Sequence, residues 1–167
     1  PARYALEEKL LNTFKKISIK SGKCLTVGCG NNLRYLSLTQ KFDLDGVDIL
    51  PPPKNIPKGF SYFQCDASNL PFKDLTYDLT IAIETFEHIK ENKQAIKEVY
   101  RTLKNEGFLI MTTPTSWTWI FEFGNHGPHY YSKTDLKNLV KEAGFKIDKI
   151  FSCGGLIFWL TNILKSW

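Results

Sequence analysis

Short apolar runs typical of β-strands alternate along this chain with segments of helical periodicity, and this alternation limits the possible folds more than any other feature. Neighbouring parallel strands need a crossover connection, which is usually a helix. The pattern therefore predicts an α/β fold, a three-layer sandwich around a mostly parallel, doubly wound sheet of six or seven strands, with a helix after each strand. Strands are expected at residues 23–27, 44–50, 60–66, 77–84, 107–113 and 145–153, and helices at residues 4–16, 93–103 and 132–144. The apolar run at residues 77–84 is typical of a strand buried on both faces, and Ser132 or Thr134 is the expected cap of the last helix. The prolines at positions 51–53 and 57 indicate a loop.

The length and composition suit one domain with one core. The chain has 167 residues, of which 43% are apolar. We expect a single domain over residues 1–167, with an N-terminal helix in residues 1–20 and an insertion at residues 115–131. The cysteines include no C-x-x-C pair, and the chain starts without a basic region followed by a long apolar run. These features predict reduced cysteines and a cytoplasmic location.

The positive charge is spread over lysine-rich helical faces. The net charge is +5, yet the sequence has no block of like charges and no arginine-rich arm. Nucleic acid is therefore not expected as a partner, and the sequence predicts no particular oligomeric state.

The apolar C-terminal segment, residues 154–167, has several interpretations. If it is helical, one face carries its large apolar side chains, and the helix could make weak contact with a membrane or be covered as core or oligomer contact. Alternatively, Gly154 and Gly155 form a hairpin turn into a seventh strand. The segment is shorter than the ~20 residues that a membrane span needs. The apolar face would consist of Leu156, Trp159, Leu160, Ile163, Leu164 and Trp167.

Glycines and acidic residues stand where four of the predicted strands end. Residues 28–32 follow the first strand, and Asp48, Asp66 and Glu84 lie at the ends of the next three. Ligands of open parallel sheets bind at the carboxyl ends of the strands, so we expect these residues to face one crevice.

The residue types at this edge fit a nucleoside. Gly28 and Gly30 let the backbone approach a ligand and leave helix N–H groups pointing at it. Asp48 can accept hydrogen bonds from two ribose hydroxyls and would repel a 2′-phosphate, while Asp66 and Ala67 lie where an adenine amine would donate. Taken singly, Asp48 is also explained as a turn residue and Asp66 as a helix N-cap. A dinucleotide is disfavoured, because Leu33 stands where its fingerprint requires a third glycine.

Five blocks of the sequence carry a resemblance to a known family. They are LTVGCGNN, GVDI, CDASNLPFKDLTYDLTIAIETFEHI, EVYRTLKNEGFLIMTTP and YYSKTDLKNLVKEAGF. In this order and spacing they resemble the class I S-adenosylmethionine-dependent methyltransferases, especially the small-molecule branch that includes the ubiquinone-pathway O-methyltransferases. The resemblance covers nearly the whole chain and implies a Rossmann-like fold with S-adenosyl-L-methionine as cofactor.

The resemblance also implies a role for each matching residue. The glycine-rich loop would line the methionine part of the cofactor, and Glu84 would lie beside the sulfonium. The ribose and adenine contacts would come from the ends of the second and third strands. The residues concerned are Gly28, Cys29 and Gly30 for the methionine part, Asp48 and Ile49 for the ribose and adenine, and Asp66 and Ala67 for the adenine edge.

The first block departs from the family pattern at two positions. The family usually has an acidic residue two positions before Gly28, which helps to hold the cofactor's ammonium group, and a third glycine at position 32. This chain has Thr26 and Asn32 instead. A hydroxyl adds no charge, so we expect reduced cofactor affinity, whereas Asn32 tolerates left-handed backbone and preserves the turn. We keep both among the expected cofactor-binding residues.

A sulfonium carries its own electrophilic methyl group, so the protein has mainly to align an acceptor and exclude water. Positioning alone can contribute ~7–11 kcal/mol. An oxygen or nitrogen acceptor also benefits from a base, and our candidates are His88, Glu84 and His129.

The E-x-x-E-H string suggests a further possibility, a metal site. Glu84, Glu87 and His88 would share one face of a helix if that helix begins near Glu84. The string resembles the divalent-metal site of ubiquinone-pathway O-methyltransferases and of small-RNA 2′-O-methyltransferases, with His126 or His129 as a further ligand. The alternative is that the histidine packs near the helix start and the glutamate caps it, and we expect no metal.

Alternating aromatic residues follow the strand at residues 107–113. They could form a lid over an apolar acceptor pocket, or simply a strand or buried flap. They are Trp117, Trp119, Phe121 and Phe123.

We therefore expect a methyltransferase that uses S-adenosylmethionine to methylate a small, partly apolar acceptor by in-line displacement. One alternative is a metal-dependent RNA 2′-O-methyltransferase, which would need a metal and a continuous basic surface. Another is a non-catalytic binding protein that has kept the fold.

Overall fold

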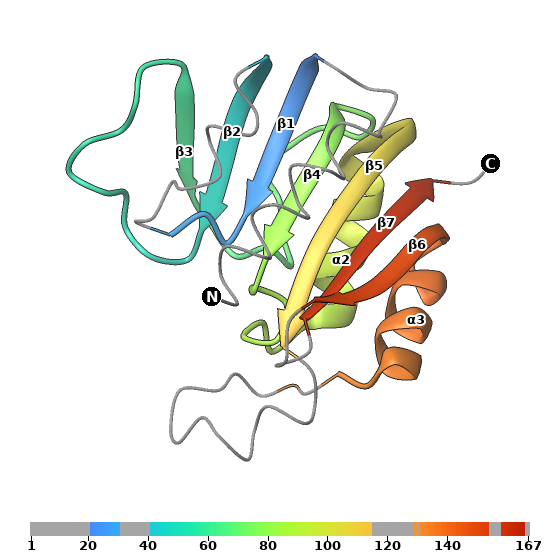
Figure 1. Ribbon diagram of the computed structural model, residues 1–167. Coiled ribbons are helices and arrows are strands. Elements are labelled where there is room, and N and C mark those ends of the chain that lie inside the picture. The colour runs from blue at the N-terminus through green and yellow to red at the C-terminus, as the bar shows by residue number, and fades with distance from the viewer. Residues whose placement is uncertain (1–20, 31–40, 115–128, 130, 154–157, 166–167) are drawn as a thin grey trace.

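The computed structural model of the chain describes residues 21–30, 41–114, 129, 131–153 and 158–165. Nine elements follow one another along these residues (Figure 1). No helix among them has the length and apolar character to cross a bilayer. The elements are β1 (Gly22–Val27), β2 (Phe42–Asp48), β3 (Phe60–Gln64), β4 (Tyr77–Ile83), α2 (Asn92–Thr102), β5 (Leu103–Pro114), α3 (Lys133–Glu142), β6 (Phe145–Cys153) and β7 (Phe158–Lys165).

The strands form one sheet in the order β3-β2-β1-β4-β5-β7-β6. The pairs from β3 to β5 are all parallel, whereas β7 is antiparallel to both of its neighbours, β5 and β6. This arrangement confirms the predicted α/β fold with a mostly parallel sheet. The chain winds outward in one direction from β1 to β3 and in the other from β4 onward. The switch point of the sheet therefore lies between β1 and β4.

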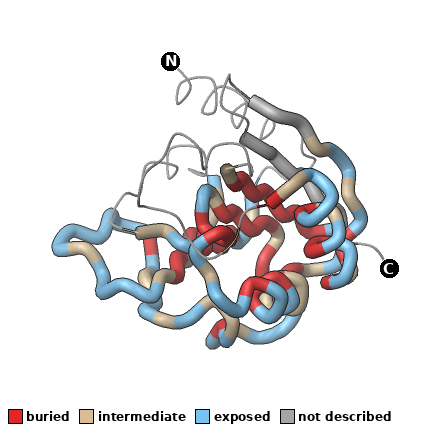
Figure 2. Tube along the Cα trace, turned by 90° about the horizontal axis from the view of Figure 1, so that it is seen from below, coloured by how far each residue is buried: buried red, intermediate tan, exposed pale blue. Residues whose placement is uncertain are grey.

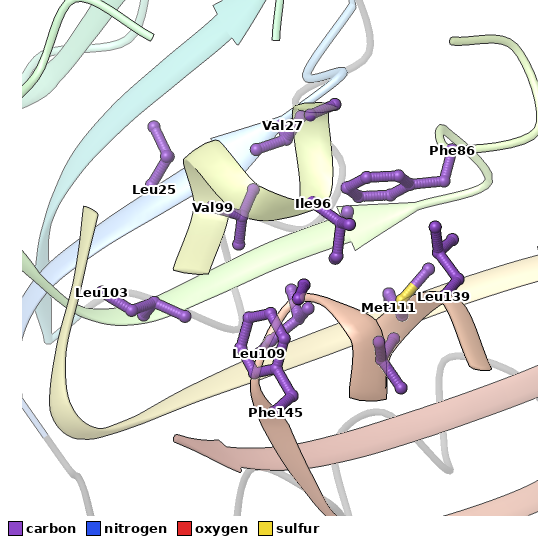
Figure 3. Close-up of a cluster of buried hydrophobic side chains, with 14 of the residues drawn as sticks. Leu25, Val27, Phe86, Ile96, Val99, Leu103, Leu109, Met111, Leu139 and Phe145 are labelled. Atoms are coloured by element: carbon purple, nitrogen blue, oxygen red, sulfur yellow. The ribbon is translucent and has the colours of Figure 1, made fainter. Parts of the chain in front are cut away.

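Helices α2 and α3 pack side by side on one face of the sheet (Figures 1 and 3). Ile96 and Val99 of α2 and Leu139 of α3 meet Leu109 and Met111 of β5 in one core cluster. The apolar positions of α2 recur at helical spacing, which turns one stripe of the helix toward the sheet. Burial of such a side chain stabilises the fold by about 1.5–3 kcal/mol.

The centre of the sheet is buried on both faces, as the apolar run at residues 77–84 predicts. Leu79 and Ile81 of β4 and Ile110 of β5 alternate with the residues of the helix-covered face, yet each is at most 2% exposed. Figure 2 shows the buried stretches gathered along the central strands, while the outer connections are exposed. The described helices all follow β4 in the chain, and the three-layer sandwich stays a prediction; the N-terminal helix expected in residues 1–20 lies outside the described residues.

The prediction of a helix after each strand is wrong for two connections. No helix joins β2 to β3 through residues 49–59, and none joins β3 to β4 through residues 65–76. In the first case the loop indicated by Pro51, Pro52, Pro53 and Pro57 is confirmed, because proline in a helix interior removes a hydrogen bond and clashes with the preceding turn. The crossover is instead an extended, exposed loop that swings outside β3 (Figure 1).

The C-terminal segment is a strand, so its interpretation as a helix resting on a membrane is wrong. Strand β7 pairs with β5 from Phe108↔Leu164 to Pro114↔Phe158 and with β6 along its other edge. As a strand between two others, β7 pairs its own backbone groups and also those along the facing edges of β5 and β6. A helix at this place would leave these edges of β5 and β6 without partners. The alternative of a seventh strand is confirmed.

The start of α3 agrees with the predicted cap. Ser132, not Thr134, is the N-cap, and its hydroxyl accepts a hydrogen bond from the Asp135 amide at 3.1 Å. The Asp135 carboxylate accepts in return from the Ser132 amide at 3.0 Å, which completes a capping box. Gly144 follows the helix with a φ of 103°, a conformation that favours glycine.

Candidate functional site

A cavity of about 610 Å³ opens at the carboxyl ends of β1 to β4, at the switch point of the sheet. Asp48 and Asp66, which the sequence places at strand ends, both line it. The predicted convergence of four strand ends on one crevice is therefore confirmed. The lining residues are Val27, Gly28, Val47, Asp48, Ile49, Leu50, Cys65, Asp66, Ala67, Glu84, Thr85, His88, Ile89, Lys90 and Glu91.

Two groups of segments contribute most of this lining. We call residues 28–30, 48–50 and 65–67, which follow β1, β2 and β3, the aspartate wall. Residues 84–91, between β4 and α2, form what we call the β4 turn. The two parts are built from different kinds of contact.

The glycine loop of the aspartate wall is fastened to β2. The amides of Gly28 and Cys29 both donate to the Val47 carbonyl, at 2.9 and 3.2 Å. Gly28 has a φ of 67° and Gly30 a φ of 53°, both in the left-handed region. A Cβ at position 28 would also collide with the side chain of Thr85. Glycine is therefore required at position 28 by backbone conformation and by space.

Asp48 connects the separate segments of the aspartate wall. Its Oδ2 accepts from the Gly30 amide at 2.7 Å, its Oδ1 accepts from the Leu50 amide at 2.9 Å, and its carbonyl accepts from the Cys65 amide at 2.9 Å. The bond to Leu50 is the turn contact that the sequence leaves open as an alternative. A carboxylate oxygen can accept more than one hydrogen bond, so Asp48 can serve the turn and still accept from a ligand hydroxyl.

Asp66 and Ala67 follow β3 in a short turn. The Asp66 Oδ1 accepts from the Ser68 amide at 2.8 Å, and the Asp66 carbonyl accepts from the Asn69 amide at 3.0 Å. The side chain therefore stabilises its own turn, and no helix begins there. Asp66 is exposed and lines the cavity together with Ala67.

The thiols beside this wall remain protonated at neutral pH. Burial raises the pKa of Cys29 to about 12, with a further contribution from the Asp48 carboxylate. Burial also raises the pKa of Cys65, and Asp66 adds to the effect. A neutral thiol is a poor nucleophile, so this pair supplies no covalent catalyst.

The β4 turn begins with a strained residue. Glu84 has a φ of 49°, uncommon for a residue with a side chain. Its amide donates to Thr112 on β5, to the carbonyl at 3.0 Å and to the hydroxyl at 3.2 Å. The condition for a shared helical face of Glu84, Glu87 and His88 is not met, because residues 84–91 form turns. The helix begins at Asn92, next to the predicted start at residue 93.

Thr85 joins the β4 turn to the aspartate wall. Its hydroxyl donates to the Val27 carbonyl at 3.1 Å and lies 3.0 Å from the Ile83 carbonyl. The same side chain occupies the space beside Gly28 that a Cβ would need. This contact links the ends of β1 and β4 across the switch point.

Glu87 is the most unusual group of the β4 turn. Its side chain is 5% exposed, and neither carboxylate oxygen has a hydrogen-bond partner among the described residues. Burial raises its pKa to about 7, and the nearby Glu84 carboxylate acts in the same direction, while the Glu87 amide and Thr113 oppose the rise. Glu87 is therefore substantially protonated near neutral pH.

Two residues between β5 and α3 form hydrogen bonds with the backbone of the β4 turn. The His129 amide donates to the Glu87 carbonyl at 3.2 Å, and its Nε2 lies 3.0 Å from the Lys90 carbonyl. The Tyr131 hydroxyl donates to the Phe86 carbonyl at 3.1 Å and accepts from the Asn92 amide nitrogen at 2.6 Å. Residues 129 and 131 thus bind three carbonyls of one short turn.

The structure does not bring all the predicted site residues to the cavity. His88 and Glu84 line it, whereas His129 does not. Thr26 lies beneath the loop, 9% exposed, with its hydroxyl donating to the Asp45 carbonyl at 3.3 Å. Cys29 and Gly30 are close to the lining but outside it, and Asn32 and His126 fall outside the described residues, as do the four aromatic residues expected near the acceptor.

Eight lining residues were missed by sequence reasoning. Four of them adjoin predicted residues at the strand ends, so widening each strand end by one position would have found them. The other four belong to the β4 turn, and their side chains carry no motif that marks them as site residues. The eight are Val27, Val47, Leu50, Cys65, Thr85, Ile89, Lys90 and Glu91.

The described residues do not form a metal site. No three metal-ligating side chains gather among them. Glu84 and His88 line the cavity, but Glu87 lies buried outside its lining. The helical face on which the metal interpretation depends is replaced by turns, so we derive no step through a metal ion.

Comparison with known proteins indicates what this fold resembles. The model of a protein family described as "Methyltransferase domain" matches residues 2–150. The chain is 30% identical to a demethylmenaquinone methyltransferase of Lactobacillus johnsonii, over 80% of this chain and 72% of that protein. It is 38% identical to a tRNA (carboxymethyluridine(34)-5-O)-methyltransferase of Arabidopsis thaliana, over 57% of this chain and 25% of that protein.

A solved structure agrees with the observed topology. A SAM dependent methyltransferase from Aquifex aeolicus superimposes with a TM-score of 0.75 at 20% identity, covering 99% of this chain and 94% of that chain. At this identity the likeness concerns the fold alone. The chain spans about half the length of other curated relatives that it matches.

Proposed function

The chain belongs to the class I S-adenosylmethionine-dependent methyltransferase family, and from that premise we propose that it transfers a methyl group to a small, partly apolar acceptor bound in the cavity at the ends of β1 to β4. The observation that carries the proposal is the meeting of Asp48, Asp66 and Glu84 at one cavity. These residues come from three strands and share no local sequence context. Their convergence depends on the fold.

The residues present fit the cofactor. A volume of about 610 Å³ lies within the range of small-molecule and cofactor sites. The aspartate wall offers acceptor oxygens at the ends of two adjacent strands, which suits the hydroxyl and amine donors of an adenosine. Asp48 would hold the ribose, Ile49 and Ala67 would contact the adenine, and Asp66 would accept from its amine. The glycine loop, with Cys29, Gly30, Thr26 and Asn32 nearby, would approach the methionine part.

When bound, the cofactor supplies an electrophilic methyl group on a sulfonium. The contribution of this chain is to orient the acceptor and exclude water. Glu84 and His88 both line the cavity and are our candidates to take a proton from an acceptor oxygen or nitrogen. His129 binds the β4 turn through its backbone and ring and does not line the cavity, so we assign it a positioning role.

A partly apolar acceptor is supported by the lining of the site. Ile49, Leu50 and Ile89 give this lining an apolar character beside its charged groups. The similarity to a methyltransferase acting on demethylmenaquinone points the same way. The atom that is methylated is left to experiment.

The RNA methyltransferase is the second candidate, because one relative acts on tRNA. That activity would require steep loss of RNA affinity with added salt, since phosphate contacts release counterions. Magnesium-dependent turnover on RNA would establish this candidate. A protein that binds the cofactor but turns over no acceptor of either class would be a non-catalytic member of the family.

Calorimetry with S-adenosylmethionine and with its demethylated product tests the first step of the proposal. We expect one site per chain, with binding lost when cavity residues are replaced. A radiolabelled methyl-transfer screen over phenolic, quinone-like and amine acceptors then tests the second step. Absence of binding at millimolar concentration would refute the proposed function.

A further inference from the structure

The connection between β2 and β3, residues 49–59, is exposed at every position except Pro53, which is half-buried. It contains two lysines, Lys54 and Lys58, and no acidic residue. Neither ammonium group forms an ion pair with the described residues. In Figures 1 and 2 the connection stands out from the edge of the sheet, and its surface is exposed.

Apolar side chains are displayed on the same connection. Ile49 is 69% exposed, Leu50 52% and Ile56 43%. Ile49 and Leu50 also line the cavity, so the connection begins at the site itself. Cofactor binding would cover Ile49 in part, but Ile56 lies outside the cavity lining and has no such explanation.

The connection is held in shape although it has no regular structure. Prolines at positions 51, 52, 53 and 57 fix the backbone angle φ. The Tyr62 hydroxyl donates to the Leu50 carbonyl at 2.8 Å, and the Phe60 amide donates to the Pro57 carbonyl at 3.2 Å. A surface that is already ordered loses little conformational entropy when it binds.

We propose that residues 49–58 dock this protein on an anionic lipid bilayer. Lysines beside exposed apolar side chains match the two attractions of such a surface, its negative potential and its apolar interior. The connection contains no arginine and no aromatic residue on which bases could stack, which disfavours RNA as the occupant. Docking would turn the cavity mouth toward the bilayer, so that an apolar acceptor can enter from the lipid; this last point rests on the proposed function.

Vesicle sedimentation with the full chain tests the proposal. We expect binding to mixed phosphatidylglycerol and phosphatidylcholine vesicles and little binding to phosphatidylcholine alone. The double variant Lys54→Gln/Lys58→Gln should weaken binding by about 25-fold, since each lysine near an anionic surface contributes about fivefold. Ile56→Ser should weaken it by about tenfold.

Matched controls lie elsewhere on the molecule. Lys146→Gln removes an exposed lysine from β6 at the other edge of the sheet, and Leu75→Asn removes an exposed apolar side chain that lies before β4. Both should bind vesicles like the wild type. Equal binding to anionic and neutral vesicles, or loop variants that bind like the wild type, would overturn the proposal.

Two further measurements separate the remaining explanations. If the lysine variant loses affinity for a tRNA while Ile56→Ser does not, and vesicles are not bound, the surface is a phosphate site for RNA and the membrane proposal fails. Calorimetry of the same variants with S-adenosylhomocysteine should show unchanged affinity. Failure of the wild type to bind that ligand would refute the proposed function and leave the vesicle result to decide this inference.

Discussion

The two sides of the cavity are built by different means. The aspartate wall is held together by short connections between adjacent strand ends, such as the carboxylate of Asp48 accepting from Gly30 and Leu50. The β4 turn has a strained first residue and a buried Glu87 whose carboxylate has no hydrogen-bond partner in the described part of the chain. It is held by Thr112, His129 and Tyr131 from later parts of the chain.

This difference suggests that the two parts of the lining have different roles. The aspartate wall, with acceptor oxygens on a self-supporting scaffold, suits a ligand that is always the same, as a cofactor is. The β4 turn depends on contacts with the region beyond β5, so changes there can reshape it without disturbing the aspartate wall. Strain and unpaired buried groups are typical of sites where function opposes stability.

The largest effect is expected where the two sides meet. Gly28→Ala places a Cβ against Thr85 at a left-handed φ, so it should lower the free energy of unfolding by about 4 kcal/mol and abolish cofactor binding. Urea denaturation gives the first quantity and calorimetry the second. Gly59→Ala is the matched control: its φ is 84°, but nothing lies within 4 Å of the added Cβ, so the loss should be about 1 kcal/mol. Equal losses would show that the contact with Thr85 is unimportant.

Glu87 should make stability depend on pH. Its pKa is raised by burial from 4.5 to about 7, so the folded state holds a proton that the unfolded state releases, and stability falls as pH rises through this range. Glu87→Gln cannot ionise, and relative to wild type it should gain about 3 kcal/mol between about pH 5 and pH 8. Above about pH 8 the two proteins should change in parallel, which is an internal control. Parallel behaviour over the whole range would mean that Glu87 is ionised and partnered in the fold.

Asp48→Ala tests the aspartate wall. Loss of the carboxylate removes the proposed ribose contacts and two loop contacts, so cofactor affinity should fall about tenfold or more. Asp43→Ala, at the exposed start of the same strand, should leave affinity unchanged. Calorimetry at one temperature and salt concentration compares the two. Unchanged affinity of Asp48→Ala would refute the placement of the ribose.

The smallest loss of stability is expected from removing a single tyrosine hydroxyl, and one such hydroxyl is available on each side of the cavity. Tyr131→Phe leaves the Phe86 carbonyl and Asn92 without a buried partner, so it should cost about 1 kcal/mol of stability. Tyr62→Phe removes an exposed bond to the Leu50 carbonyl and should cost less than about 0.5 kcal/mol, since water can replace it. Thermal unfolding measures both. A larger loss from Tyr62→Phe would contradict the view that the β4 turn depends on distant contacts.

Much of the aspartate wall could be predicted from the sequence. The periodicity of a strand is a local pattern, so the strand ends can be located in the sequence. Parallel strands end at one edge of the sheet, and residues at these ends are therefore expected to form a site. This reasoning identified Asp48, Asp66 and Ala67, which line the cavity. The β4 turn could not be predicted in the same way. Glu84, Glu87 and His88 have the spacing of one helical face in the sequence. In the structure the amide of Glu84 donates to β5, and residues 84–91 form turns and no helix.

The two connections without a helix and the C-terminal strand also show where local sequence patterns are insufficient to predict an element. The prolines after β2 were visible, and their local effect outweighs the general preference for helical crossovers. For residues 158–165 the local pattern fitted both helix and strand, and pairing with β5 and β6 decided between them. Local periodicity cannot distinguish these states when a segment is short and apolar.

The amino-acid sequence by itself determined the alternation of elements, the residues at the strand ends and the family to which the chain belongs, because each of these is written in local patterns. Only the tertiary structure decided which strand ends are neighbours, where Glu87 is buried and that Thr85 fills the space beside Gly28. Those facts depend on contacts between residues far apart in the chain, and no local pattern contains them.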